Sequence, residues 1–175
     1  AMGAGLYRIN LDTKEIYRCP STANGFEYRP LSNILHNSWI NCLLCSTNDK
    51  LYIGTYDGLG CLDIPTMDFV STYEINRLLQ GDVIYALYED LHHNIWVGTS
   101  QGLKQLNPQT QKVREYTISD GLPSNSISAI EEDANGNLWI STNFGISRFN
   151  PGTQTFVNFY ASDGLQGNEF SKGVS

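Results

Sequence analysis

A set of aromatic, amide and charged side chains stands in the segments that connect the predicted strands. An aromatic ring covers the apolar face of a sugar, and amide, carboxylate and guanidinium groups hydrogen-bond its hydroxyl groups. Binding residues are concentrated in connecting segments, because these vary while a rigid scaffold holds them. We therefore predict ligand contacts, with a carbohydrate as the favoured ligand, for Trp39, Tyr56, Asp57, Arg77, Asn125 and Phe144.

The cysteines offer a second chemistry, which is metal binding or redox exchange. The chain has four cysteines, and Cys42 and Cys45 have the Cys-x-x-Cys spacing of metal and redox sites. Residues i and i+3 of one strand point to opposite faces, so these two are poorly placed to share a metal or a disulfide. We expect no metal and no cofactor. A disulfide of Cys45 with Cys61 or Cys19 stays open.

Enzyme chemistry has little support in the sequence. His92 and His93 are adjacent in a predicted hairpin turn, which is typical of solvated turn residues. The run 131–133 is three consecutive carboxylates at a strand end, and this placement explains them better than acid–base catalysis does. The sequence has no nucleophile motif. We expect no catalytic residues in this chain.

The elements that position these residues come from a sequence that occurs three times. Residues 90–107 (DLHHNIWVGTSQGLKQLN) and 133–150 (DANGNLWISTNFGISRFN) are the clearest copies, and Trp96 and Trp139 stand 43 positions apart. A third copy, 46–63 (STNDKLYIGTYDGLGCLD), has a tyrosine at the tryptophan position. A period of about 40–45 residues that holds several short strands is typical of a β-propeller blade.

Each copy is predicted to form four short antiparallel strands, A to D. Tight turns such as Asn135-Gly136 separate strands A and B, and a glycine marks each B–C turn. Trp96 and Trp139 are expected to be buried between neighbouring sheets, because one blade cannot cover both of its faces. The predicted strands are 40–44, 84–89 and 127–132 for A, 51–55, 95–99 and 138–142 for B, 145–150 for C of the last copy, and 69–73, 113–116 and 156–160 for D.

Fragments of the same pattern flank the three copies. The predicted fold class is therefore all-β: an incomplete β-propeller of about three full four-stranded antiparallel blades with partial terminal blades. Such ends leave unpaired sheet edges, so we expect a homodimer through the exposed blade edges. The predicted divisions are 1–34 (strands C and D of a partial blade with a long loop), 35–79, 80–122 and 123–165 (three blades), and 166–175 (the start of the next blade).

Composition excludes some partners. The formal net charge is −7 and no Lys/Arg cluster is present, which disfavours nucleic acid and anionic membrane surfaces. Hydrophobic residues make up 41% of the chain, which is enough for a packed core. No apolar stretch has the length needed to span a bilayer.

The last copy carries a family resemblance. Residues 120–127 (DGLPSNSI), 132–142 (EDANGNLWIST) and 145–151 (GISRFNP) closely resemble the two-component regulator propeller repeat. The second copy matches well, and the first more loosely. Residues 163–170 (DGLQGNEF) are similar to the lead-in of a further blade, which places the chain among the C-terminal blades of such a region.

The resemblance implies a periplasmic sensor region of a Bacteroides-type hybrid two-component protein. Members of that family detect carbohydrate fragments and pass the signal across the inner membrane to a histidine kinase. The resemblance also implies that an oligosaccharide or another small ligand is the partner of the full-length protein. The motif belongs to the scaffold, so it does not identify the ligand.

The D–A and B–C connections of a propeller gather on one face around the central channel, and this is where we expect a ligand. The structural alternative is that Tyr56 and Phe144 cover the channel and that Trp39 packs under the long loop. Two other functions stay open. One is a fragment of a propeller lyase or hydrolase, and the other is a purely structural or protein-interaction propeller.

Overall fold

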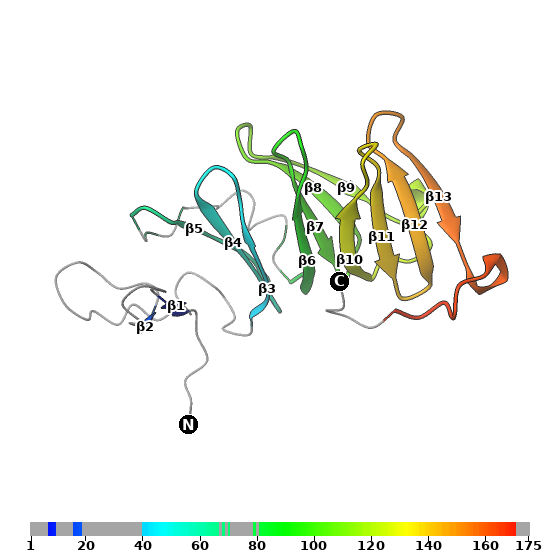
Figure 1. The fold of residues 1–175 in the computed structure, drawn as a ribbon, viewed down its shortest axis with the longest axis horizontal. Coiled ribbons are helices and arrows are strands. Elements are labelled where there is room, and N and C mark those ends of the chain that lie inside the picture. The colour runs from blue at the N-terminus through cyan, green and yellow to red at the C-terminus, as the bar shows by residue number, and fades with distance from the viewer. Residues whose placement is uncertain are drawn as a thin grey trace, which may run out of the picture.

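The structure is a computed structural model and describes residues 7–9, 16–18, 40–66, 68, 70, 79 and 81–170, with the backbone alone for 7–9 and 16–18. Within these residues the fold is nearly all β-structure, arranged as a row of antiparallel sheets (Figure 1). Two short 3-10 helices, η2 (Ile118–Asp120) and η3 (Ala161–Asp163), follow the last strands of two sheets. The predicted all-β class is confirmed.

Strands that are consecutive in the sequence are neighbours in each sheet. We call the three larger sheets the first, second and third blades. A two-stranded sheet precedes them and pairs β1 (Tyr7–Ile9) with β2 (Ile16–Arg18). The first blade contains β3 (Ile40–Cys45), β4 (Lys50–Thr55) and β5 (Gly58–Asp63). The second contains β6 (Ile84–Glu89), β7 (Ile95–Thr99), β8 (Leu103–Asn107) and β9 (Lys112–Tyr116). The third contains β10 (Ile127–Glu132), β11 (Leu138–Thr142), β12 (Gly145–Asn150) and β13 (Thr155–Phe159).

The predicted strands therefore form, with bounds that shift by a residue or so. The exception is strand D of the first copy, 69–73, most of which lies outside the described residues. The predicted division of the chain into blades stays a prediction at its outer boundaries, because residues 1–6, 19–39 and 171–175 are also outside them.

The antiparallel order of the strands separates the connections onto two ends of the molecule. The A–B and C–D turns lie at one end, and the B–C turns and D–A connections lie at the other, which is the lower edge of Figure 1. We call the first the hairpin end and the second the loop face. This is the separation that the strand order predicted.

The core lies between the blades. One cluster joins the first blade to the second through Tyr52, Leu59, Cys61, Leu79, Ile84, Ile95, Val97 and Leu106. Another joins the second blade to the third through Trp96, Leu103, Tyr116, Leu122, Ile127, Ile130, Leu138, Ile140 and Phe149. The first and second blades thus each bury one face against the blade that follows, as a repeat architecture requires.

Trp96 is the largest side chain that is fully buried in these cores. Its ring centroid lies 5.7 Å from that of Phe149 in an edge-on arrangement, and 5.9 Å from that of Tyr116. Aromatic rings favour such offset and edge-on contacts. The predicted burial of Trp96 between two blades is confirmed.

A glycine in strand B lets the next blade approach this closely. A Cβ atom on Gly98 would lie 2.7 Å from Cγ2 of Ile127, and one on Gly54 would lie 2.7 Å from Cγ2 of Ile84. Both isoleucines begin strand A of the following blade. A larger residue at either glycine would therefore push two blades apart.

The prediction that Trp139 is also buried is wrong. Its side chain is 37% exposed, whereas Trp96 has no exposed surface. The Trp139 ring stacks on Phe159 of its own blade at 5.6 Å. Among the described residues no further sheet covers this side of the third blade, so the ring keeps one open face.

The homodimer through exposed blade edges stays a prediction.

A carboxylate holds each strand-B tryptophan in place at the hairpin end. The Trp96 indole N–H donates to Asp90 Oδ2 at 2.8 Å, and the backbone N–H of Asn94 donates to Asp90 Oδ1 at 2.8 Å. The third blade repeats this arrangement with Asp133, Asn137 and Trp139. Hydrogen bonds from Asn137, chiefly its backbone N–H, lower the pKa of Asp133 to about 2. These aspartates therefore shape the hairpin turns.

Glutamates at the end of strand A link neighbouring blades. Glu89 accepts hydrogen bonds from the backbone N–H and the hydroxyl group of Thr47 in the first blade, at 2.7 and 2.6 Å. Glu132 occupies the same position one blade later and accepts a hydrogen bond from Tyr88 at 3.2 Å. Two of the three consecutive carboxylates, Glu132 and Asp133, are thus placed for structure, as we expected.

The two tryptophans provide the test of this packing. We predict that Trp96→Ala lowers the free energy of unfolding by about 3–5 kcal/mol, because it leaves a cavity between two blades. Trp139→Ala should have a clearly smaller effect, because its ring is partly exposed. Urea denaturation measures both, and iodide should quench the fluorescence of Trp139 in preference to that of Trp96. Equal losses of stability would contradict the packing described above.

Candidate ligand-binding face

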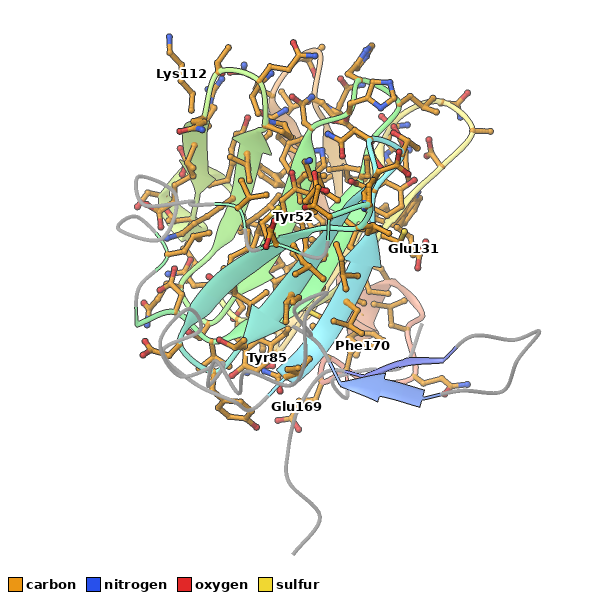
Figure 2. All side chains as sticks on the ribbon, turned by 90° about the vertical axis from the view of Figure 1, so that its left-hand side faces the viewer. Tyr52, Tyr85, Lys112, Glu131, Glu169 and Phe170 are labelled. Atoms are coloured by element: carbon orange, nitrogen blue, oxygen red, sulfur yellow. The ribbon has the colours of Figure 1, made fainter. Side chains whose placement is uncertain are left out.

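The loop face consists of the B–C turns and the D–A connections. Its described parts are the turn residues 56–57, 100–101 and 143–144 and the connections 81–83, 117–126 and 160–169. Figure 2 shows Tyr85, Glu169 and Phe170 together at this end and Lys112 at the opposite end. The loop face is therefore built from all three blades.

Each B–C turn is held by its first and last residues. The Thr99 hydroxyl group donates to the Gly102 carbonyl oxygen at 2.9 Å and accepts from the backbone N–H of Gln101 at 2.9 Å. Gly102 has a φ of 147°, and a Cβ atom there would lie 2.6 Å from the Tyr116 carbonyl oxygen. The sequence between Thr and Gly is thereby free to vary.

The same turn recurs in the other two blades. Thr55 and Thr142 donate to Gly58 and Gly145 in the same way, at 2.9 and 3.0 Å. The two residues between threonine and glycine differ in every blade: they are Tyr56-Asp57, Ser100-Gln101 and Asn143-Phe144. These pairs are the positions at which the sequence of the turn varies between blades.

The D–A connections are held by a side-chain amide. The Asn125 side-chain oxygen accepts a hydrogen bond from the backbone N–H of Ile118 at 2.9 Å, across the turn that contains η2. Asn168 does the same for Ala161 at 2.7 Å. The side-chain oxygen of Asn125 is therefore engaged within the loop.

A buried ion pair lies beneath the loop face between the first two blades. Lys104 Nζ is 2.6 Å from Asp82 Oδ2 and 3.6 Å from Glu115 Oε1. The side chains of Lys104 and Asp82 are only 8% and 10% exposed. The Asp82 carbonyl oxygen in turn accepts from the backbone N–H of Gly58, at 3.0 Å. The ion pair thus fixes the connection against which the first B–C turn rests.

Sequence reasoning missed this pair. The signal was present, because strand C of the third blade has Ser147 where the second has Lys104. The third blade uses neutral groups: Ser147 donates to Asn158 at 2.6 Å, and Asn158 donates to the Gly121 carbonyl oxygen at 2.9 Å. A charged residue at a position that is neutral in another copy of the repeat therefore indicates an ion pair specific to that blade.

The structure describes only some of the residues that we predicted to contact a ligand. Tyr56 and Phe144 are 46% and 53% exposed on the loop face, and they stand in the turns of the first and third blades. Asp57 accepts a hydrogen bond from the backbone N–H of Gly81 at 2.9 Å, which links the turn to the neighbouring connection. Arg77 and Trp39 lie outside the described residues. The ligand-contact assignments themselves remain predictions.

The described cysteines are free thiols. Burial raises the pKa of Cys42 to about 12 and that of Cys61 to about 11, so both are protonated at neutral pH and react weakly. Cys19 lies outside the described residues. Nowhere in the described part of the chain do three or more His, Cys, Asp or Glu side chains form a group that could hold a metal ion.

The histidine pair lies at the hairpin end, far along the strands from the loop face. His93 Nδ1 is 3.0 Å from both Glu89 Oε1 and the Thr47 hydroxyl group. His93 thus adds to the link between the first and second blades. The pair lies in a hairpin turn as we expected, but the contact of His93 with the first blade was not predicted.

These repeats have known relatives. Residues 121–144 match the family model of the two component regulator propeller. The resemblance predicted from the last copy is confirmed. No curated protein matches this chain significantly.

Solved structures show the same fold. The extracellular domain of a putative hybrid two component system from B. thetaiotaomicron matches with a TM-score of 0.65 at 21% identity, over 74% of this chain and 18% of that chain. The extracellular domain of a putative one component system from that organism matches with a TM-score of 0.72 at 22% identity, over 95% of this chain and 22% of that one. This chain therefore spans about a fifth of the length of either structure.

A lyase shares the fold as well. Virginiamycin B lyase from Staphylococcus aureus matches with a TM-score of 0.59 at 18% identity, over 87% of this chain and 47% of the lyase. Identities this low carry the fold and not the chemistry.

In the part of the chain that the structure describes, no helix is long and apolar enough to cross a membrane.

The buried ion pair gives a direct test of how the loop face is positioned. We predict that Lys104→Met lowers the free energy of unfolding by about 3–5 kcal/mol, because it leaves the buried Asp82 carboxylate without its cation. One repeat later, Asn125 and Ser147 stand at the positions of Asp82 and Lys104. The double variant Asp82→Asn/Lys104→Ser installs these uncharged residues and should recover most of the loss. Urea denaturation measures both. A Lys104→Met protein as stable as the wild type would contradict the assignment.

Proposed function

We propose that this chain is part of the periplasmic sensor region of a hybrid two-component protein and that it recognises carbohydrate fragments on its loop face. The support for a sensor is the match of residues 121–144 to the two component regulator propeller, together with the fold shared with extracellular domains of such systems. In the complete protein, the signal would pass to a histidine kinase.

The observation that carries the ligand site is the exposure of aromatic rings at positions where the sequence of the B–C turn varies between blades. Tyr56 and Phe144 occupy variable positions of the B–C turns, and both are about half exposed. An exposed ring is a suitable platform for the apolar face of a sugar, and neighbouring amide groups can bind its hydroxyl groups. In this proposal the chain binds the ligand and has no catalytic role, and the histidine kinase of the complete protein carries out the catalysis.

Isothermal titration calorimetry against a panel of oligosaccharides tests the proposal. We expect at least one sugar to bind, and Tyr56→Ala to weaken its binding by about tenfold or more. Leu91→Ala is the matched control, because Leu91 is 80% exposed at the hairpin end and should not affect binding. Binding that Tyr56→Ala leaves unchanged would remove the first blade from the site. The absence of any binding would favour a purely structural role for these blades.

A further inference from the structure

The repeat itself separates two causes of aromatic exposure. Trp139 is exposed because its side of the third blade is uncovered, since the equivalent Trp96 is fully buried where the next blade is present. Phe144 is different. Its equivalent in the second blade is Gln101, which stays exposed although the third blade is in place. The exposure of Phe144 on the loop face is therefore a property of its position and not of a missing neighbour.

Tyr160 stands beside Phe144, and it replaces a residue that stabilises the second blade. Thr117, its equivalent, accepts a hydrogen bond from the backbone N–H of Ser119 at 3.3 Å and so caps η2. Tyr160 makes no such side-chain bond to cap η3. A side chain that caps a helix stabilises it by satisfying a backbone N–H group of the first turn. The third blade therefore has an aromatic ring where a capping side chain would be more stabilising.

The two rings are held together by the turn. The ring centroids of Phe144 and Tyr160 are 5.7 Å apart, with their planes at 53°. The Tyr160 ring lies over Gly145, whose added Cβ would be 3.0 Å from Cδ1 of that ring. Asn143 precedes Phe144 in the same turn and is exposed. One small area thus offers two aromatic rings and a side-chain amide.

The charges that the structure describes around this area are all of one sign. Asp120, Asp163 and Glu169 are exposed on the loop face. Its described parts, namely 56–57, 81–83, 100–101, 117–126, 143–144 and 160–169, contain no Lys, Arg or His. Asp120 and Asp163 are engaged with backbone N–H groups of Thr117 and Tyr160, at 2.8 Å each, and therefore do not converge on a cation. Such a surface repels an anionic ligand without offering a cation site.

We infer that Phe144 and Tyr160 form a stacking subsite for an uncharged sugar ring, with Asn143 as a partner for its hydroxyl groups. This inference rests on the proposed function and narrows it in two ways. It places one sugar-binding contact on the third blade, and it selects neutral oligosaccharides over those that contain uronic acids or sulfate groups.

The second blade supplies the residues for the test. The double variant Phe144→Gln/Tyr160→Thr installs the equivalents that the second blade already uses, so it should fold with a Tm at least equal to that of the wild type. We expect calorimetry to show its affinity for the bound neutral oligosaccharide reduced by about tenfold or more. Phe144→Tyr keeps an aromatic ring and should bind within about threefold of the wild type.

Galacto-oligosaccharide and oligogalacturonate are the matched ligands for the charge preference, because they differ by the carboxylate on each ring. We expect the acidic one to bind at least about tenfold more weakly than the neutral one, with the difference shrinking at high salt. A double variant that binds as the wild type does would overturn the subsite. Equal or tighter binding of the acidic ligand would overturn the charge preference. If no oligosaccharide of either kind binds, the proposed function fails, and this inference fails with it.

Discussion

Each blade of this molecule has one apolar face that only the next blade can cover, and the rest of the structure depends on this contact. Trp96 fills the space between the second and third blades and lies against Phe149. Gly98 permits the approach, because any side chain there would meet Ile127. The constraint applies again at each blade, so the sequence must present the same residues at the same spacing.

The same constraint leaves the loop face available for function. Threonine and glycine fix the ends of each B–C turn, and the two residues between them differ from blade to blade. Because the chain contains three copies of this turn, each copy serves as a control for the others. An exposed ring such as Phe144 is informative because the equivalent Gln101 shows that the position stays open when the blades are complete.

The fold could be predicted from the sequence because its cause is periodic. The spacing of the copies and the turn residues within them identified the strands, and strand order identified the loop face. The repeat also relates a contact in the first blade to one in the second. Asn107 donates a hydrogen bond to Asn94 in the second blade, and Lys50 and Asp63 form an ion pair at the equivalent positions of the first. When two positions change together between copies of a repeat, as this pair does, the two side chains are expected to be in contact.

The rest depends on contacts that no periodicity encodes. The exposure of Trp139 follows from what lies beyond its blade, and a motif cannot report that. The pairing of Lys104 with Asp82 joins a strand to a connection whose path varies between blades. The contact of Phe144 with Tyr160 arises across a turn and the end of β13, so neither residue alone indicates it.

Native-state hydrogen exchange is the most direct test of the claim that neighbouring blades supply each other's stability. The second blade is covered on both faces and the third on one, while their backbone hydrogen bonds are alike. The account therefore predicts a higher free energy of opening for amides in β7 and β8 than for their equivalents in β11 and β12. Equal protection in the two blades, or stronger protection in the third, would contradict it.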